Sequence, residues 1–132
     1  MEVVVDASVL IAVITNEDEK EKLVALTDEA ELIAPLSVHW EIGNAFSSLL
    51  KRKRIAIDEA LQAIEIYLQI PVRFVEVELS DSLQLADEFG LYAYDAYLLR
   101  CAEKYRLPLL TLDTRLAQAA KDRKIQVLEA AE

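Results

Sequence analysis

Cysteine, histidine, glycine and proline are all scarce in this sequence. Its 132 residues include one cysteine, one histidine, two glycines and three prolines. A single cysteine cannot form an intramolecular disulfide, and one cysteine with one histidine cannot supply a zinc site. We find no linker, internal repeat or low-complexity segment. Residues 1–132 are therefore expected to form one compact domain, with Cys101 as a small core residue and a cytoplasmic location.

Long apolar runs and basic residues are scarce as well. No stretch approaches the roughly 18 apolar residues of a membrane span. The start, MEVVVDASVL, lacks the features of a signal peptide, so we expect the mature chain to begin here. Fourteen Lys and Arg residues stand against 24 Asp and Glu residues, a net charge of −10. This charge argues against a protein that coats nucleic acid, but not against a nuclease that gathers its acids at one metal site.

Strand-like and helix-like patterns alternate along the chain. Short apolar runs predict strands at 2–5, 32–34, 72–77, 109–112 and 125–128. Helical spacing and end signals predict helices at 8–14, 16–30, 39–53, 58–70, 80–89, 94–105 and from 113 onward. This alternation is typical of an α/β domain whose mainly parallel sheet is covered on both faces. The pattern alone does not give the order of the strands.

Some helices carry signals that allow finer predictions. Ser37 is placed to cap the helix at 39–53, Asp58 to cap the helix at 58–70, and Gly90 to stop the helix at 80–89. Helix 58–70 is indicated by apolar residues at 57, 61, 64 and 68. The candidates for the buried side of helix 39–53 are Trp40, Phe46, Leu49 and Leu50.

Four acidic residues from distant parts of the chain are expected to converge. In an open parallel sheet the ligand site lies beyond the carboxyl ends of the strands. Asp6 ends the first strand, and Asp113 ends the strand at 109–112. Glu41 lies in the first turns of the helix that follows strand 32–34, and Asp95 begins a helix after the loop GLYAY. All four carboxylates can therefore meet in one cleft.

Each acid also has a structural interpretation. Asp95 and Asp113 both occupy helix-cap positions, and capping alone would explain either of them. A salt bridge to a distant lysine would explain Glu41, which has apolar neighbours and no charge at i+4. Asp6 directly follows a buried strand and is harder to explain without a site. His39 is expected to be a structural or surface residue.

The chemistry of four converging carboxylates points to a divalent cation. Such groups repel one another, so one of them takes up a proton or the cluster binds cations. Hard oxygen ligands suit Mg²⁺ or Mn²⁺. Hydrolysis of a phosphodiester by metal-activated water is then the natural reaction.

Several polar residues are placed to support the acids. Ser8 follows Asp6 by two positions, Thr111 precedes Asp113 by two, and Asn44 lies at i+3 from Glu41. Their hydroxyl and amide groups can orient carboxylates. Ser8 can equally cap a helix, and Asn44 can simply be exposed. A further residue of the same helix, Gly43, suggests close packing or the close approach of a ligand.

With these residues assembled, the chain resembles the PIN domain family, in particular the VapC-type toxins of prokaryotic toxin–antitoxin pairs. The matching stretches are VVVDASVLIA, PLSVHWEIGNAF, YDAYLLRCAEKYRLPLLTLDTRL and IQVL, from Val3 to Leu128. By position, the family's metal-binding acidic quartet falls on Asp6, Glu41, Asp95 and Asp113, with Ser8, Asn44 and Thr111 as its polar companions.

The resemblance implies a parallel sheet of about five strands between helices. It also implies Mg²⁺- or Mn²⁺-dependent endoribonuclease activity, a homodimer, and a cognate antitoxin that inserts a C-terminal segment into the cleft. Tyr92 and Tyr94 depart from many relatives, which leaves substrate preference open. Either ring can stack on a base, although a packed structural role is the simpler expectation.

Two other functions remain open at this point. Phosphatases of the haloacid dehalogenase type use an Asp followed two residues later by a second Asp, but Ser8 occupies that position and no catalytic lysine is evident. A PIN-fold protein that holds a partner without cutting RNA is the second alternative. The presence of all four acids favours the enzyme. The sequence does not identify the RNA target or the antitoxin.

Overall fold

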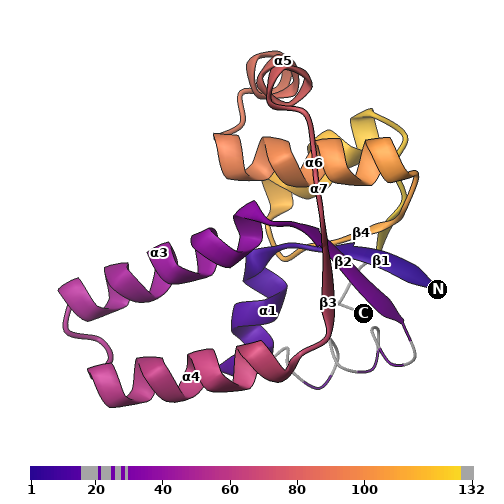
Figure 1. The fold of residues 1–132 in the computed structure, drawn as a ribbon. Coiled ribbons are helices and arrows are strands. Elements are labelled where there is room, and N and C mark those ends of the chain that lie inside the picture. The colour runs from indigo at the N-terminus through magenta and orange to yellow at the C-terminus, as the bar shows by residue number, and fades with distance from the viewer. Residues whose placement is uncertain (16–20, 22–24, 26–27, 29, 129–132) are drawn as a thin grey trace.

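The computed structural model describes residues 1–15, 21, 25, 28 and 30–128 (Figure 1). The predicted helix at 16–30 lies largely outside these residues. The described elements are β1 (Glu2–Val5), α1 (Ala7–Ile14), β2 (Glu31–Pro35), α3 (Ser37–Lys51), α4 (Ile57–Gln69), β3 (Val72–Val75), α5 (Leu79–Phe89), α6 (Ala93–Tyr105), β4 (Leu109–Leu110), α7 (Thr114–Asp122) and β5 (Val127–Leu128). The predicted α/β class is confirmed.

The five strands form one parallel sheet with β1 at its centre. The strand order is β3-β2-β1-β4-β5. Val4 of β1 is in register with Ile33 of β2 on one side and with Leu109 of β4 on the other. The chain therefore builds outward from β1 through β2 to β3 and then returns to the opposite side of β1. This reversal places the switch point of the sheet beside the carboxyl end of β1.

Helices cover both faces of the sheet. Figure 1 shows α6 and α7 on one face, with α5 outside α6, and α1 on the opposite face. The helices α3 and α4 run beside each other in opposite directions, and both contact α1. No helix in the described part of the chain is long and apolar enough to cross a membrane.

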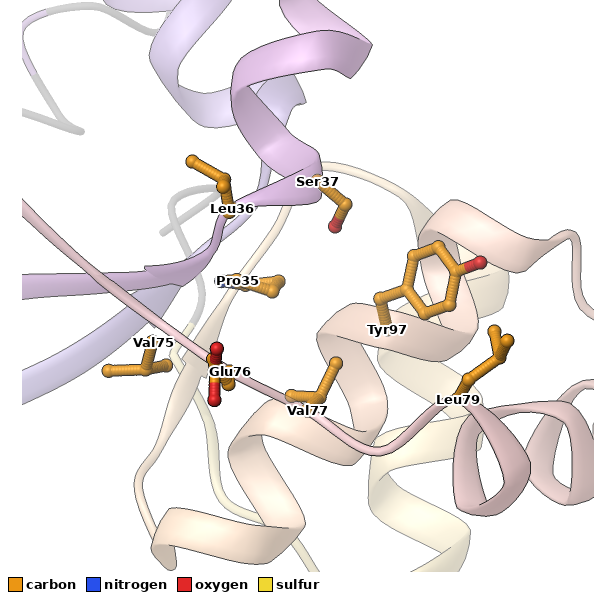
Figure 2. Close-up of a pocket in the computed structure, with 8 residues that line it drawn as sticks. All are labelled: Pro35, Leu36, Ser37, Val75, Glu76, Val77, Leu79 and Tyr97. Carbon is orange, nitrogen blue, oxygen red and sulfur yellow. The ribbon is translucent and has the colours of Figure 1, made fainter.

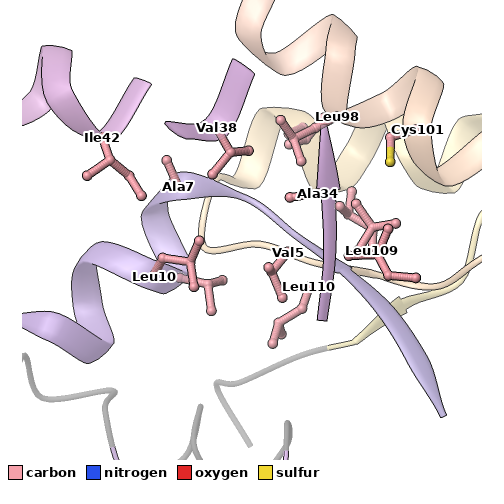
Figure 3. Close-up of a cluster of buried hydrophobic side chains, with 14 of the residues drawn as sticks. Val5, Ala7, Leu10, Ala34, Val38, Ile42, Leu98, Cys101, Leu109 and Leu110 are labelled. Carbon is pink, nitrogen blue, oxygen red and sulfur yellow. The ribbon is translucent and has the colours of Figure 1, made fainter. Parts of the chain in front are cut away.

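The core lies between the central strands and the helices α1 and α6 (Figure 3). Val5 of β1, Leu10 of α1, Leu98 of α6 and Leu109 of β4 are all buried. Each side chain of this size stabilises the fold by roughly 1.5–3 kcal/mol when it leaves water. Cys101 is buried in the same core, as predicted, and burial raises the pKa of its thiol to about 12.

Two predicted helix caps are wrong. α3 begins at Ser37 itself, its N-cap is Leu36, and no side chain caps it. α4 begins at Ile57, so Asp58 lies inside the first turn and not before it. The N-terminus of α4 is instead stabilised by Glu59, whose carboxylate accepts a hydrogen bond from the Ala56 backbone N–H at 3.0 Å.

The helix faces also differ from the simplest expectation. Phe46 is buried and Leu49 and Leu50 are partly buried, as predicted, but Trp40 is 62% exposed. α4 buries its small residues Ala60 and Ala63 together with Tyr67. The larger apolar residues Ile57, Leu61 and Leu68 lie mostly in solvent, and Ile64 is partly buried.

The two glycines behave differently. Gly90 ends α5 in the left-handed conformation, with φ at 63°, so its predicted role as a helix stop is confirmed. Gly43 is exposed, and a Cβ placed on it would meet no atom within 4 Å. The close packing suggested for Gly43 is therefore wrong.

Candidate active site

Asp6 lies where β1 ends and α1 begins. Its side chain is only 5% exposed. Oδ1 accepts hydrogen bonds from the Ser8 hydroxyl at 2.6 Å and from the Val9 backbone N–H at 3.2 Å, so Asp6 is also the N-cap of α1. Oδ2 accepts a hydrogen bond from the Thr111 hydroxyl. Burial raises the pKa of Asp6, and these hydrogen bonds oppose the rise.

Ser8 and Thr111 connect the end of β1 to the segment that follows β4. The Ser8 hydroxyl accepts a hydrogen bond from the Leu112 N–H at 3.1 Å. The Thr111 hydroxyl accepts one from the Asp113 N–H at 3.0 Å. Each hydroxyl therefore donates to Asp6 and accepts from the neighbouring segment. Both residues lie where the predicted supporting role requires.

Asp113 caps the helix α7. Its Oδ1 accepts hydrogen bonds from the backbone N–H groups of Arg115 at 2.9 Å and Leu116 at 3.0 Å. The capping role considered for Asp113 is thus confirmed. Both capping hydrogen bonds go to Oδ1, and no hydrogen bond of Oδ2 is found among the described residues.

Glu41 reaches the same region from the second turn of α3. Burial raises the pKa of Glu41 to about 7, with further contributions from the charges of Asp6, Asp95 and Asp113. Within the described part of the chain Glu41 forms no salt bridge. A distant lysine among the described residues therefore does not account for this carboxylate.

Asp95 is the third residue of α6. Tyr92 is the N-cap of that helix and no side chain caps it, so the capping role considered for Asp95 is wrong. Burial raises the pKa of Asp95 to about 6, and the charges of Asp113 and Asp6 add to this effect. Arg115 acts in the opposite direction and lowers it.

The raised pKa values of Asp6, Glu41 and Asp95 each include the charge of at least one other acid of the four, so these carboxylates lie within electrostatic reach of one another. Among the described residues, however, no three acidic, cysteine or histidine side chains lie close enough together to hold one metal ion as they stand. The two observations are compatible, because charges act over longer distances than metal–ligand bonds. Unneutralised carboxylates also repel one another, which opposes a tight cluster.

Asn44 is exposed on α3, one turn beyond Glu41. No hydrogen bond of its side chain is found among the described residues. Its predicted role as a companion of Glu41 therefore stays a prediction.

The aromatic residues near the acids take different positions. Tyr92 is 80% exposed, so the packed role expected for it is wrong. Tyr94 is partly buried, and its ring lies 6.4 Å from that of Tyr97. His39 has the structural role expected of it, with Nδ1 3.1 Å from the Tyr67 hydroxyl.

One basic residue near the site was given no site role from the sequence. Arg115 lies two positions after Asp113, and its charge acts on Asp95 across the site. The signal in the sequence was a basic residue two positions after Asp113, the last of the four acids. Its side chain is a candidate for contact with a phosphate group.

Comparison with known proteins agrees with this geometry. The sequence profile of the PIN domain family matches residues 3–122. Ribonuclease VapC3 of Pyrobaculum aerophilum is 30% identical over 123 residues, which cover 89% of this chain and 94% of that protein.

Solved structures show the same fold. A Pyrobaculum aerophilum protein of known crystal structure has a TM-score of 0.73 at 26% identity, covering 96% of this chain and 83% of its own. A chain of a toxin–antitoxin complex from Klebsiella pneumoniae has a TM-score of 0.61 at 18% identity, covering 98% of both chains. The chain described here belongs to the PIN domain family.

Proposed function

We propose that this protein is a metal-dependent endoribonuclease and the toxin of a type II toxin–antitoxin pair. The observation that supports the proposal is that Asp6, Asp95 and Asp113, from separate elements near the switch point of the sheet, all raise the pKa of Glu41 through their charges. The relative at 30% identity bears the name ribonuclease, which supports the same reaction. No observation favours a scaffold without catalysis.

The residues present fit a divalent cation. All four side chains offer carboxylate oxygens, the ligands that Mg²⁺ and Mn²⁺ prefer. Asp6, Asp95 and Asp113 would hold the cation, and Glu41 would complete the site. When bound, such an ion lowers the pKa of water and stabilises negative charge on the oxygens of a phosphodiester.

The protein's own contribution is to fix the acids before substrate arrives. Ser8 and Thr111 orient Asp6 by donating to its two different oxygens. No such hydrogen bond of Glu41 is found in the described part of the chain, and its position is set by the packing of its helix, in which Val38 and Ile42 are fully buried. Rigid support of this kind keeps the ligand oxygens aligned.

The direct test is an RNA cleavage assay with Mg²⁺ or Mn²⁺ against a chelator. Asp95→Asn removes one charge while keeping the size of the side chain, and we expect activity to fall at least about 100-fold. Asp87→Asn, an exposed acid on α5, is the matched control and should cut RNA like the parent. Cleavage by Asp95→Asn at the parent rate, with the fold intact by circular dichroism, would contradict the proposal.

Two partners follow from the same proposal. A cognate antitoxin is supported by the structural similarity to a chain of a toxin–antitoxin complex. A homodimer is supported by the apolar side chains exposed on α4, Ile57, Leu61 and Leu68, because monomers rarely leave such groups in water together.

A further inference from the structure

A pocket of about 480 Å³ lies beyond the carboxyl ends of β2 and β3 (Figure 2). This volume is within the roughly 300–1,000 Å³ typical of small-molecule sites. Apolar side chains dominate its walls, and Glu76 is the one charged residue among those that line it. The lining residues are Pro35, Leu36, Ser37, Val75, Glu76, Val77, Leu79 and Tyr97.

The pocket adjoins the acidic site through two helices. Ser37 precedes Glu41 by four residues on α3, which is about 6 Å along the helix axis. Tyr97 follows Asp95 by two residues on α6. Ser37 and Glu41 lie on the same side of α3, so this wall of the pocket is about one helical turn from Glu41.

Ser37 supplies an unsatisfied polar atom at this pocket. Its Oγ is buried and has no hydrogen-bond partner, the one such side-chain atom in the described part of the chain. Figure 2 shows this oxygen directed toward the space that the Tyr97 ring bounds on the other side. A buried hydroxyl without a partner destabilises the folded protein, and a polar group of a ligand would remove that cost.

We propose that the pocket binds a nucleobase of the RNA, next to the phosphodiester that is cut. The inference rests on the proposed ribonuclease function and names the part of the substrate that the neighbouring surface recognises. A base presents an apolar face to Val77, Leu79 and the Tyr97 ring, and a polar edge to the Ser37 hydroxyl. An apolar side chain of a protein partner would leave that hydroxyl unpaired. Because Oγ is covered in the empty pocket, the contact requires a local rearrangement that exposes this oxygen.

The test uses the chain with Asp95→Asn, which binds RNA without cutting it. The parent first cuts a fluorescein-labelled RNA oligonucleotide, which maps the cleavage site. A series of the same oligonucleotide then carries one abasic nucleotide at each position in turn, and fluorescence anisotropy gives each Kd. We expect one position beside the cleavage site to weaken binding about tenfold.

Pocket variants connect that loss to this cavity. Val77→Trp fills the pocket and should make binding insensitive to the abasic position, whereas Leu83→Trp, at an exposed site on α5, should leave the effect unchanged. Ser37→Ala is a second pocket variant, for the case in which the tryptophan disturbs folding. It removes the unpaired hydroxyl, so it should reduce the abasic effect without lowering the melting temperature.

Several outcomes would overturn the proposal. One is equal binding of every abasic oligonucleotide by a chain whose parent cuts RNA, which would refute the base pocket and leave the ribonuclease standing. Another is an abasic effect that Val77→Trp and Ser37→Ala both leave intact. Unchanged RNA binding by Val77→Trp, together with lost antitoxin binding, would assign the pocket to the protein partner. A parent that cuts no RNA refutes both proposals together.

Discussion

The Asp6 carboxylate has two structural connections at once. One oxygen caps α1 and the other accepts a hydrogen bond from Thr111, 105 residues further along the chain. The same side chain is almost fully buried beside other acids, which raises its pKa. Asp6 therefore stabilises the folded state through its hydrogen bonds and destabilises it through its buried charge. We expect Glu41 and Asp95, for which no side-chain hydrogen bond is found among the described residues, to show the cost of the charge more clearly.

Glu41 provides the first prediction. Its pKa in the folded protein, about 7, is raised above the ordinary 4.5, so the folded state binds the proton more tightly than the unfolded chain. Without divalent cations, stability should therefore fall as the pH rises from 4.5 to about 7, and Asp95 should contribute in the same direction up to about 6. Urea denaturation at both ends of this window measures the fall.

Glu41→Gln should make that pH dependence shallower, while Glu65→Gln, an exposed residue of α4, should not change it. Mn²⁺ should stabilise the parent most at the upper end, where the acids are ionised. Glu78 acts in the opposite sense, because ion pairs lower its pKa to about 2, but its contribution is lost only below the window. A parent whose stability rises steadily from 4.5 to 7 and ignores Mn²⁺ would contradict the shared site.

Single residues differed in how well they could be predicted. The four acids were singled out because strand ends and helix starts of a parallel sheet meet at one edge, whichever order the strands take; their role stays a prediction. Tyr92 was expected to pack and is exposed, because an aromatic residue in a loop has no periodicity that reveals its direction. The second role of Asp6, as N-cap of α1, was not predicted because its place after a strand suggested a site alone.

The helix α7 depends on one of the proposed ligands for its start. Asp113 accepts from two backbone N–H groups that would otherwise lack partners. A substitution at this position can therefore change the stability of α7 and the activity separately. A new side chain can keep the capping oxygen while it loses the negative charge.

The second prediction separates these effects. Asp113→Asn keeps an oxygen that can cap α7, so the free energy of unfolding should change little while RNA cleavage falls at least about 100-fold. Asp113→Ala should lose the same activity and in addition about 1 kcal/mol of stability. Chemical denaturation and the cleavage assay on both variants measure the two effects. Equal stability of the two variants would show that the cap contributes nothing.

The helix α4 shows where periodicity misleads. Large apolar residues at 57, 61, 64 and 68 correctly predicted a helix, yet three of them are mostly exposed. The face that contacts the core uses Ala60 and Ala63, whose small side chains allow α4 to approach α1 closely. The predicted starts of two helices were also wrong. α3 begins at Ser37 and α4 at Ile57, whereas the predicted caps would have placed both starts later in the chain. It was easier to predict that a helix exists than to predict where it begins or which face it buries.

The third prediction concerns association of the whole molecule. If α4 forms part of a dimer interface, the parent should sediment at about twice 14.9 kDa. Leu61→Ser with Leu68→Ser should shift it toward the monomer, because both side chains would lose their burial in the dimer. Leu83→Ser, an equally exposed residue on α5, serves as the control. A parent that stays monomeric at micromolar concentration would rule out the proposed homodimer.

The arrangement of the sheet was only partly predictable. Alternating strands and helices correctly indicated a parallel sheet, and they predicted a site at its carboxyl edge. The order β3-β2-β1-β4-β5 was not predicted, because apolar strands buried on both faces have no local feature that selects a neighbour. The pocket beside the acids was missed for a related reason, since segments near residues 36, 76 and 97 form it only once the sheet is assembled.

The central position of β1 has a consequence for the synthesis of the protein. β1 is made first, but one of its two neighbours, β4, follows only after most of the chain. Thr111 and Asp113 are made with that late segment, so Asp6 lacks the hydrogen bond from Thr111 and the neighbouring carboxylate of Asp113 before then. Non-local contacts of this kind form late in folding. We therefore expect the four carboxylates to come together only after β4 has paired with β1, when almost the whole chain has been made.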